Sequence, residues 1–263
     1  MEIQYLFVDG GCLRETLADY SLRFFDGDKI EFDYERLGRE YQKVFYYDSP
    51  PPKNSDEKEA EYQERITPEL EFFSQLNLLD GFHVYEGISR RRRKKVEQKK
   101  VDIMIAVDML NHSFRKNMSK ATLLTSDLDF KPLIEALVDN GMYINLWYPL
   151  NRTNIELIQS ADSSKKLDLH AVYDYCTPSF KQSHYIPKGS NKIGQDLFNV
   201  TKIGDIKNRF GIEGEIFKAN DRLTHYLLFK TYYNEKAYTH LEFENIDKLK
   251  AYFDEYSYPN QKV

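Results

Sequence analysis

Short apolar runs alternate with segments of helical spacing through the first two thirds of the chain. Residues 3–8 (IQYLFV) are too continuously apolar for a strand with one solvated face, which favours a central strand of a parallel sheet. Further strands are predicted over residues 43–47, 82–88, 121–125 and 142–147, and helices over 13–25, 34–41, 69–79, 101–110, 131–138, 154–161 and 167–175. This order predicts an α/β fold whose parallel sheet has helices on both faces.

Two aspartates stand where one of these strands is followed by a helix. In the segment TLLTSDLDF, residues 122–130, Asp127 and Asp129 come after the apolar residues and before the helix predicted from residue 131. That position is the carboxyl edge of an open α/β sheet, where ligands bind. A structural alternative is that Asp127 caps a turn and Asp129 is the N-cap of the helix; capping explains Asp129 better than Asp127.

Three other aspartates have comparable positions. Asp9 follows the strand 3–8 and precedes a glycine pair, so its alternative role is a plain turn. Asp102 falls in the first turn of the helix 101–110, where the helix macrodipole also favours an acid. Asp108 lies about 120° further around that helix among apolar neighbours, so it needs either a structural partner or a cation.

These acids are predicted to converge if the strands 3–8 and 121–125 are neighbours. The predicted set is Asp9, Asp102, Asp127 and Asp129, with Asp108 as a fifth candidate. Four carboxylates at one edge repel one another, and divalent cations would resolve that repulsion. All-oxygen donors suit Mg²⁺ or Mn²⁺ rather than zinc, and a two-metal site with ions roughly 4 Å apart hydrolyses phosphodiesters. The sequence contains neither a Ser-His-Asp set in recognisable form nor a GxxxxGK[ST] loop.

A strongly basic segment, SRRRRKKVEQKK, occupies residues 89–100. Its cations are Arg90, Arg91, Arg92, Arg93, Lys94, Lys95, Lys99 and Lys100. With Glu97 the segment carries +7 in a chain whose net charge is −5, so the remainder carries −12. The segment is either a solvated loop or a phosphate-binding arm. Because it leads directly to Asp102, we favour the phosphate-binding arm and nucleic acid as the partner.

The composition predicts a soluble protein of a reducing compartment. Two cysteines among 263 residues are too few for a disulfide framework. The sequence has neither a membrane-spanning apolar run nor a secretory signal, so a cytoplasmic location is expected. From residue 178 the sequence mixes polar and aromatic residues without the earlier strand–helix alternation. This change predicts a first domain over residues 1–177 and a small α+β domain or extension of unknown role over 178–263. A homo-oligomer is left open.

Three motifs carry a family resemblance. FVDGG at residues 7–11, KKVDIMIAVD at 99–108 and TSDLDF at 125–130 together resemble the NYN domain of the PIN-like nucleases, and most closely its LabA-like branch. The TSDLDF turn also resembles the paired-aspartate element of flap endonucleases. The resemblance extends over about residues 3–175. It implies a PIN-like three-layer α/β/α sandwich and a Mg²⁺- or Mn²⁺-dependent ribonuclease.

The resemblance assigns roles by position and also shows two departures. It implies Asp9, Asp102, Asp127 and Asp129 as the catalytic metal ligands, with the hydroxyl of Thr125 beside them. Cys12 stands where many members have asparagine, and Ser126 stands where the last motif commonly has glycine.

The resulting hypothesis is a metal-dependent endoribonuclease, acting on RNA rather than DNA. The alternative from another class is a non-catalytic RNA-binding or adaptor module on a nuclease fold. A phosphatase is disfavoured because the segment after Asp9 lacks a second aspartate two residues on.

Overall fold

The computed structural model describes residues 3–87, 90–92, 95–97, 99–186, 190–193, 197–230 and 237–256. The chain divides into two compact units, which are described separately. The first comprises the described residues of Met1–Asp19 and Ile30–Thr177, and the second those of Tyr20–Lys29 and Pro178–Val263.

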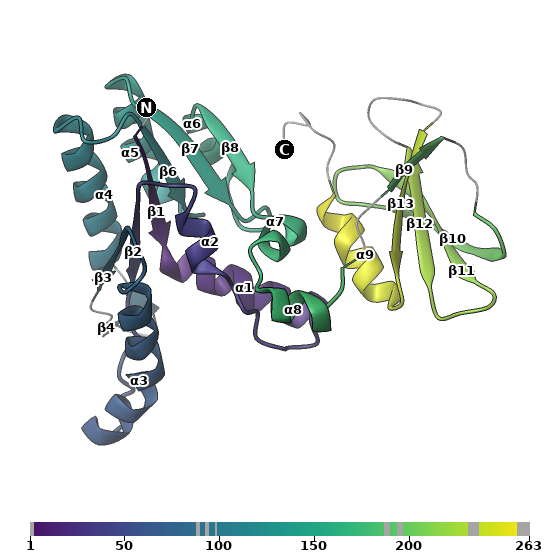
Figure 1. Cartoon of the computed structure of the whole chain (residues 1–263), viewed down its shortest axis with the longest axis horizontal. Helices are drawn as coiled ribbons and strands as arrows, with labels where there is room; N and C mark the ends of the chain where they lie inside the picture. Colours follow the sequence, from purple (N-terminus) through teal and green to yellow (C-terminus); the bar gives the residue numbers. More distant parts are fainter. Residues whose placement is uncertain are drawn as a thin grey trace. The chain divides into compact units, whose positions relative to one another are not determined.

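A six-stranded parallel sheet forms the centre of the first unit (Figure 1). Its strands are β1 (Gln4–Asp9), β2 (Lys43–Asp48), β3 (Phe82–Glu86), β6 (Lys120–Leu124), β7 (Tyr143–Tyr148) and β8 (Ser163–Lys166). They lie in the order β3-β2-β1-β6-β7-β8, and every neighbouring pair is parallel. The predicted α/β fold with a PIN-like layered sheet is therefore confirmed. The polar strand β8, SSKK, was not predicted because it has no apolar run.

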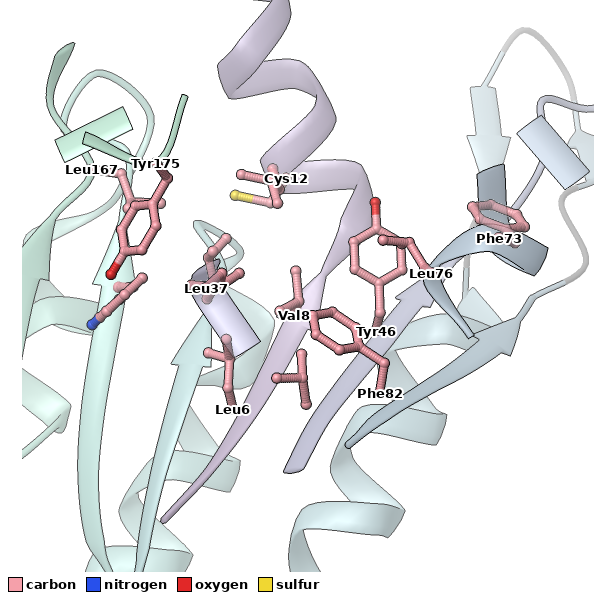
Figure 2. Close-up of a cluster of buried hydrophobic side chains, with 14 residues drawn as sticks. Leu6, Val8, Cys12, Leu37, Tyr46, Phe73, Leu76, Phe82, Leu167 and Tyr175 are labelled. Atoms are coloured by element: carbon pink, nitrogen blue, oxygen red, sulfur yellow. The ribbon is translucent and has the colours of Figure 1, made fainter. Parts of the chain in front are cut away.

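Helices pack on both faces of this sheet, because successive side chains of a strand point to opposite faces. Leu6 and Val8 of β1 belong to a core shared with α1 (Gly10–Phe24), α2 (Tyr34–Gly38) and α3 (Glu59–Leu76) (Figure 2). Tyr5 and Phe7 point the other way and meet His112 of α4 (Lys99–Phe114). On this second face α5 (Lys131–Asp139) packs against β7 and α6 (Ile155–Ser160) against α5. α7 (Leu169–Asp174) completes the helices of the unit's described residues.

The structure corrects one interpretation of the sequence between β2 and β3. Residues 53–64 have no apolar face before Tyr62, which predicts an exposed excursion or insertion, but α3 already begins at Glu59. The N–H of Lys58 donates to Glu61 Oε2 at 3.1 Å and so stabilises the first turn, and Ile66 is the first buried residue of the helix. Local capping forms the helix before the apolar stripe begins, which is why periodicity missed it.

The basic segment includes two short strands. β4 (Arg90–Arg92) and β5 (Lys95–Glu97) pair in antiparallel register, with Arg90 opposite Glu97. Arg93 and Lys94, between the two strands, lie outside the described residues.

The second unit has a five-stranded antiparallel sheet. Its elements are α8 (Pro178–Ser183), β9 (Ser190–Ile193), β10 (Val200–Lys207), β11 (Glu213–Ala219), β12 (His225–Lys230), β13 (Ala237–Phe243) and α9 (Ile246–Glu255). The strand order is β10-β11-β12-β13-β9. Leu249 and Phe253 of α9 pack on Leu227 and Phe229 of β12 in a separate core. Among the helices of the described residues, none is long and apolar enough to cross a membrane.

The close approach of Gly10 to Asp48 gives a prediction about stability. A Cβ atom on Gly10 would lie 2.7 Å from both Asp48 Cβ and Tyr46 Cζ, which are buried and cannot move away freely. We expect Gly10→Ala to lower the free energy of unfolding by about 1–2 kcal/mol, the usual cost of overpacking less a small gain in helix propensity. Urea unfolding followed by fluorescence of Trp147 measures it, because the single tryptophan reports on the first unit.

Gly204→Ala is the matched control for this substitution. Gly204 lies in β10 of the second unit, and a Cβ atom there would meet nothing within 4 Å. The transition reported by Trp147 should stay unchanged in this variant. Equal transitions for both variants would contradict the packing described around Gly10.

Candidate active site at the carboxyl edge

Acidic residues end three adjacent strands at the carboxyl edge of the parallel sheet. Asp9 is the last residue of β1, Asp48 of β2 and Glu86 of β3. Asp48 and Glu86 are register partners, whereas Asp9 is paired with Tyr47, one residue before Asp48. On the other side of β1, the pair Val8 and Leu124 brings the segment after β6 to the same edge. The predicted neighbourhood of the two strands is confirmed.

Asp9 is held in place by groups from two elements. Its Oδ1 accepts a hydrogen bond from the backbone N–H of Cys12, at 3.0 Å, and its Oδ2 accepts one from the hydroxyl of Thr125, at 2.9 Å. The pKa of Asp9 is nevertheless raised above its usual range, chiefly by burial, with further contributions from the charges of Asp48 and Asp127. The carboxylate is fixed in position, but its charge is not compensated.

The TSDLDF segment forms a tight turn over the same edge. Asp127 is the N-cap of a short 3₁₀ helix, η1 (Leu128–Phe130), and its Oδ1 accepts a hydrogen bond from the N–H of Asp129 at 2.9 Å. The N–H of Asp127 donates to Thr125 Oγ1 at 3.2 Å. The interpretation that capping suits Asp129 better than Asp127 is therefore wrong, because the helix starts earlier and in 3₁₀ form. One hydroxyl, that of Thr125, connects Asp9 to this turn.

Asp102 reaches the same edge from α4, where it lies in the first turn. Its pKa is raised to about 6, first by burial and then by the charges of Asp9, Asp127 and Asp129. The three charges that act on Asp102 are those of the other carboxylates singled out in the sequence, so all four face the same edge. Among the described residues, however, no three Asp, Glu, His or Cys side chains are grouped closely enough to hold a metal ion.

Asp108 has a different environment. The hydroxyl of Tyr47 donates a hydrogen bond of 2.8 Å to its Oδ2. Asp108 lies six residues after Asp102, about 9 Å further along the helix axis, and it is not among the residues whose charge raises the pKa of Asp102. This placement favours the structural alternative for Asp108.

Asp48 was not among the site residues predicted from the sequence, although it is buried beside Asp9. Arg14 Nη1 donates to Asp48 Oδ2 at 2.5 Å and to Glu69 Oε1 at 2.6 Å. The N–H of Ser49 donates to Asp48 Oδ1 at 2.8 Å. The signal was present, because Asp48 ends an apolar run, KVFYYD, in the same way as Asp9 ends its own. The predicted strand was ended one residue too early.

The two departures from the family pattern lie against each other. The thiol of Cys12 donates to the hydroxyl of Ser126 at 3.5 Å. Burial raises the pKa of Cys12 to about 12, so the thiol is protonated at neutral pH. Together the two side chains fill the space between the start of α1 and the TSDLDF turn, and neither removes a carboxylate.

The basic residues precede this site in the chain. β4 and β5 hold Arg90, Arg91, Arg92 and Lys95, and the first turn of α4 holds Lys99 and Lys100. The chain thus passes from a basic antiparallel pair of strands directly into the helix that carries Asp102.

The first unit is thus an α/β domain with aspartates along the carboxyl edge of its parallel sheet. Residues 17–168 match the model of the NYN domain. The match extends over more than half of the chain, and the protein belongs to the NYN domain family. This membership gives it a nuclease-like, RNA-related function at the level of the family. The match includes Asp102, Asp127 and Asp129, whereas Asp9 precedes it.

Other comparisons add little. A search of curated proteins finds no match. A protein of unknown function from Vibrio parahaemolyticus RIMD 2210633 is similar at 16% identity and a TM-score of 0.42, over 67% of this chain and 96% of its own. A dehydrogenase from Clostridium difficile shows 9% identity and a TM-score of 0.26, over 97% of this chain and 88% of its own.

The raised pKa of Asp102 predicts how stability depends on pH without divalent cations. Near pH 4 the carboxyl group is protonated in the folded chain, so it costs the fold little. As the pH rises through 6 the folded group ionises beside other acids, and this ionisation costs more free energy than it does in the unfolded chain. We expect Asp102→Asn to be more stable than the wild type by about 1–2 kcal/mol at pH 8, since partial solvation screens the repulsion. The gain should vanish near pH 4.

Urea unfolding in EDTA at the two pH values measures this difference. Asp139→Asn, an exposed aspartate of α5, is the matched control and should show no gain at either pH. A stability gain of Asp102→Asn that is equal at pH 4 and pH 8 would contradict the raised pKa of Asp102.

Proposed function

We propose that the protein is a metal-dependent endoribonuclease that hydrolyses phosphodiester bonds of RNA at the carboxyl edge of the parallel sheet. The observation that supports this most is that β1 and β6 bring Asp9 and the TSDLDF turn to one edge, where the hydroxyl of Thr125 donates to Asp9. Burial, and then the charges of Asp9, Asp127 and Asp129, raise the pKa of Asp102 at the same edge. Carboxylates that repel one another in a family of nuclease-like domains are best explained as ligands of a cation that the reaction requires.

The donor set fits Mg²⁺ or Mn²⁺. All four groups are carboxylates, and the guanidinium of Arg14, beside this edge, is already bonded to Asp48 and Glu69. When bound, the ions would supply an activated water and stabilise the attacking and leaving oxygens. A bound cation would offset the repulsion among the four carboxylates.

Each residue of the site has its own proposed role in holding the metal ions. Asp9 is the fixed ligand, since Thr125 and the N–H of Cys12 hold both of its oxygens. Asp102 comes from a different element, so it completes the donor set from the helix side. Asp127 and Asp129 present carboxylates from one tight turn. Ser126 and Thr125 support that turn rather than the ions, and Asp108 is bonded to Tyr47.

The basic segment gives this site its substrate class. Its cations would track the phosphate backbone and leave the bases unread, which suits a nuclease without strict sequence choice. The same proposal includes three further points: the substrate is RNA rather than DNA, the protein belongs to the LabA-like branch of the family, and it is located in the cytoplasm. A division into a nuclease domain over residues 1–177 and a second domain or extension over residues 178–263 belongs to this proposal as well.

A non-catalytic RNA-binding module is the second candidate. Cys12 and Ser126 depart from the residues usual in the family, and the described carboxylates are not grouped as a finished metal site. A binder would keep its affinity for RNA in EDTA and after Asp9→Asn, and it would show no turnover with any divalent cation.

Cleavage of single-stranded RNA in Mn²⁺ tests the catalytic proposal. We expect cleavage by the wild type and a loss of at least about a hundredfold in Asp127→Asn, because losing a metal ligand removes several kcal/mol of transition-state stabilisation. Asp139→Asn, which changes an exposed aspartate of the same unit, should keep full activity. Equal activity in the wild type and Asp127→Asn would reject the assignment.

The salt dependence of RNA binding tests the role of the basic segment. We expect the double substitution Arg91→Gln and Arg93→Gln to flatten the dependence of log affinity on log salt by roughly 0.7 for each phosphate that the arginines no longer neutralise. Fluorescence anisotropy with Ca²⁺ in place of Mn²⁺ measures binding without relying on turnover.

Arg39→Gln is the control for that experiment. Arg39 is exposed at the end of α2, where it pairs with Glu35, and its loss should leave the slope unchanged. A slope that is the same in the wild type and the double variant would show that the segment is only a solvated part of the surface.

A further inference from the structure

An arginine of α1 lies at the carboxyl edge beside Asp9. Gly10 directly follows Asp9, and a Cβ atom on Gly10 would lie 2.8 Å from Asp48 Oδ2. The same oxygen of Asp48 accepts a hydrogen bond from Arg14 Nη1 at 2.5 Å. The charge of Asp48 also contributes, after burial, to the raised pKa of Asp9. The guanidinium of Arg14 is therefore one carboxylate away from the first of the proposed metal ligands.

Two carboxylates hold the same nitrogen of this guanidinium. Besides Asp48, Nη1 donates to Glu69 Oε1 of α3 at 2.6 Å. The hydrogen bonds that join Arg14 to the described residues all use Nη1, which leaves the N–H groups of Nε and Nη2 for another acceptor. Parallel N–H groups of this kind bind two oxygens of a phosphate at once.

The two acids differ in how much they depend on Arg14. The side chain of Asp48 is 1% exposed, that of Glu69 20% and that of Arg14 44%. A buried carboxylate without a cation is costly, so the pair of Arg14 and Asp48 is part of the fold. Burial raises the pKa of Glu69 even though Arg14 opposes the rise, and the charge of Asp48 adds to it. The contact of Arg14 with Glu69 is therefore the one that is open to competition by another anion.

Arg14 and the helix that carries Asp102 belong to opposite faces of the sheet. α1 and α3 share a core on one face, whereas α4 packs against Tyr5 and Phe7 on the other. The basic segment ends in the first turn of α4. An RNA strand that contacts both the basic segment and Arg14 therefore crosses the carboxyl edge, and its backbone passes the four carboxylates there.

We infer that Arg14 binds a phosphate of the RNA substrate through Nε and Nη2, and that Glu69 weakens this contact by sharing the positive charge of Arg14. The inference rests on the proposed function, because it takes RNA as the ligand of this edge. It assigns Arg14 to substrate binding and not to the metal ions. Neutralisation of Asp48 requires a cation at this position, but it requires neither an arginine that is 44% exposed nor a second carboxylate on Nη1.

RNA binding in Ca²⁺, which avoids turnover, tests the contact. Arg14→Gln is combined with Asp48→Asn, so that no buried carboxylate loses its cation and the net charge of the protein stays the same. We expect this double variant to bind single-stranded RNA about tenfold more weakly than the wild type in fluorescence anisotropy, because charge-assisted hydrogen bonds to a phosphate are lost. Urea unfolding establishes that each variant is folded.

Glu69→Gln tests the role of the competing acid. It should tighten RNA binding by at least about threefold in the wild type, because the guanidinium is no longer shared, and it should leave the affinity of the double variant unchanged. Glu71→Gln is the matched control, since Glu71 is an exposed acid of the same helix, and it should leave the affinity unchanged. A gain from Glu69→Gln that persists in the double variant would indicate general repulsion of RNA and overturn the role of Glu69.

Cleavage of RNA in Mn²⁺ separates this inference from the proposed function. The double variant should have a higher KM and a nearly unchanged kcat, whereas Asp127→Asn should have a lower kcat. A wild type that binds RNA without cleaving it would reject the catalysis, and the binding series would still decide on Arg14. Equal affinity of the wild type and the double variant, or a wild type that does not bind RNA, would overturn the role of Arg14.

Discussion

The parallel pairing of β1 with β6 is the interaction on which the site depends. It sets Val8 beside Leu124, so the two chain segments that follow these strands leave the sheet at the same edge. The hydrogen bond from Thr125 to Asp9 then joins residues 116 positions apart in the sequence. A register shift of one residue would turn Thr125 to the other face of the sheet and break that bond. The positions of Asp9 and of the TSDLDF turn are thus set by the pairing of the strands, not by interactions between charges.

Asp9 and Asp48 end neighbouring strands, and they differ in whether a cation of the fold is bonded to the carboxylate. Asp48 is bonded to the guanidinium of Arg14, to a backbone N–H and to Tyr46, so a cation of the fold offsets its charge, although burial raises its pKa. Among the described residues, Asp9 accepts hydrogen bonds from a backbone N–H and a hydroxyl, and the charges that raise its pKa are those of Asp48 and Asp127. A carboxylate that the fold orients but does not neutralise is the one that suits an external cation. Arg14 also keeps Asp48 from adding its full repulsion to the edge.

Much of the first unit could be predicted from sequence because its strands and helices have strong local signals. β1, β2, β6 and β7 carry apolar runs, and the acids after them could be placed at one edge by topology alone. The strand β8 and residues 59–68 of α3 could not be predicted, since tertiary pairing and capping rather than apolar periodicity form them. The role of Asp127 as a cap depends on the 3₁₀ start of the following helix, which has no distinct sequence pattern. The ion pair of Asp48 with Arg14 joins residues 34 positions apart and needed the fold to become visible.

α4 shows how one helix can serve two surfaces. Its inner residues pack on β1 and β2, and this packing fixes the level at which Asp102 meets the edge. Its outer residues contribute nothing to that core, so their apolar character is not required by the fold of the first unit. Solvation would favour polar residues at such positions, and a chain with 30% charged residues has no shortage of them. Ile103, Val107 and Phe114 therefore form apolar surface that the core of the first unit does not use.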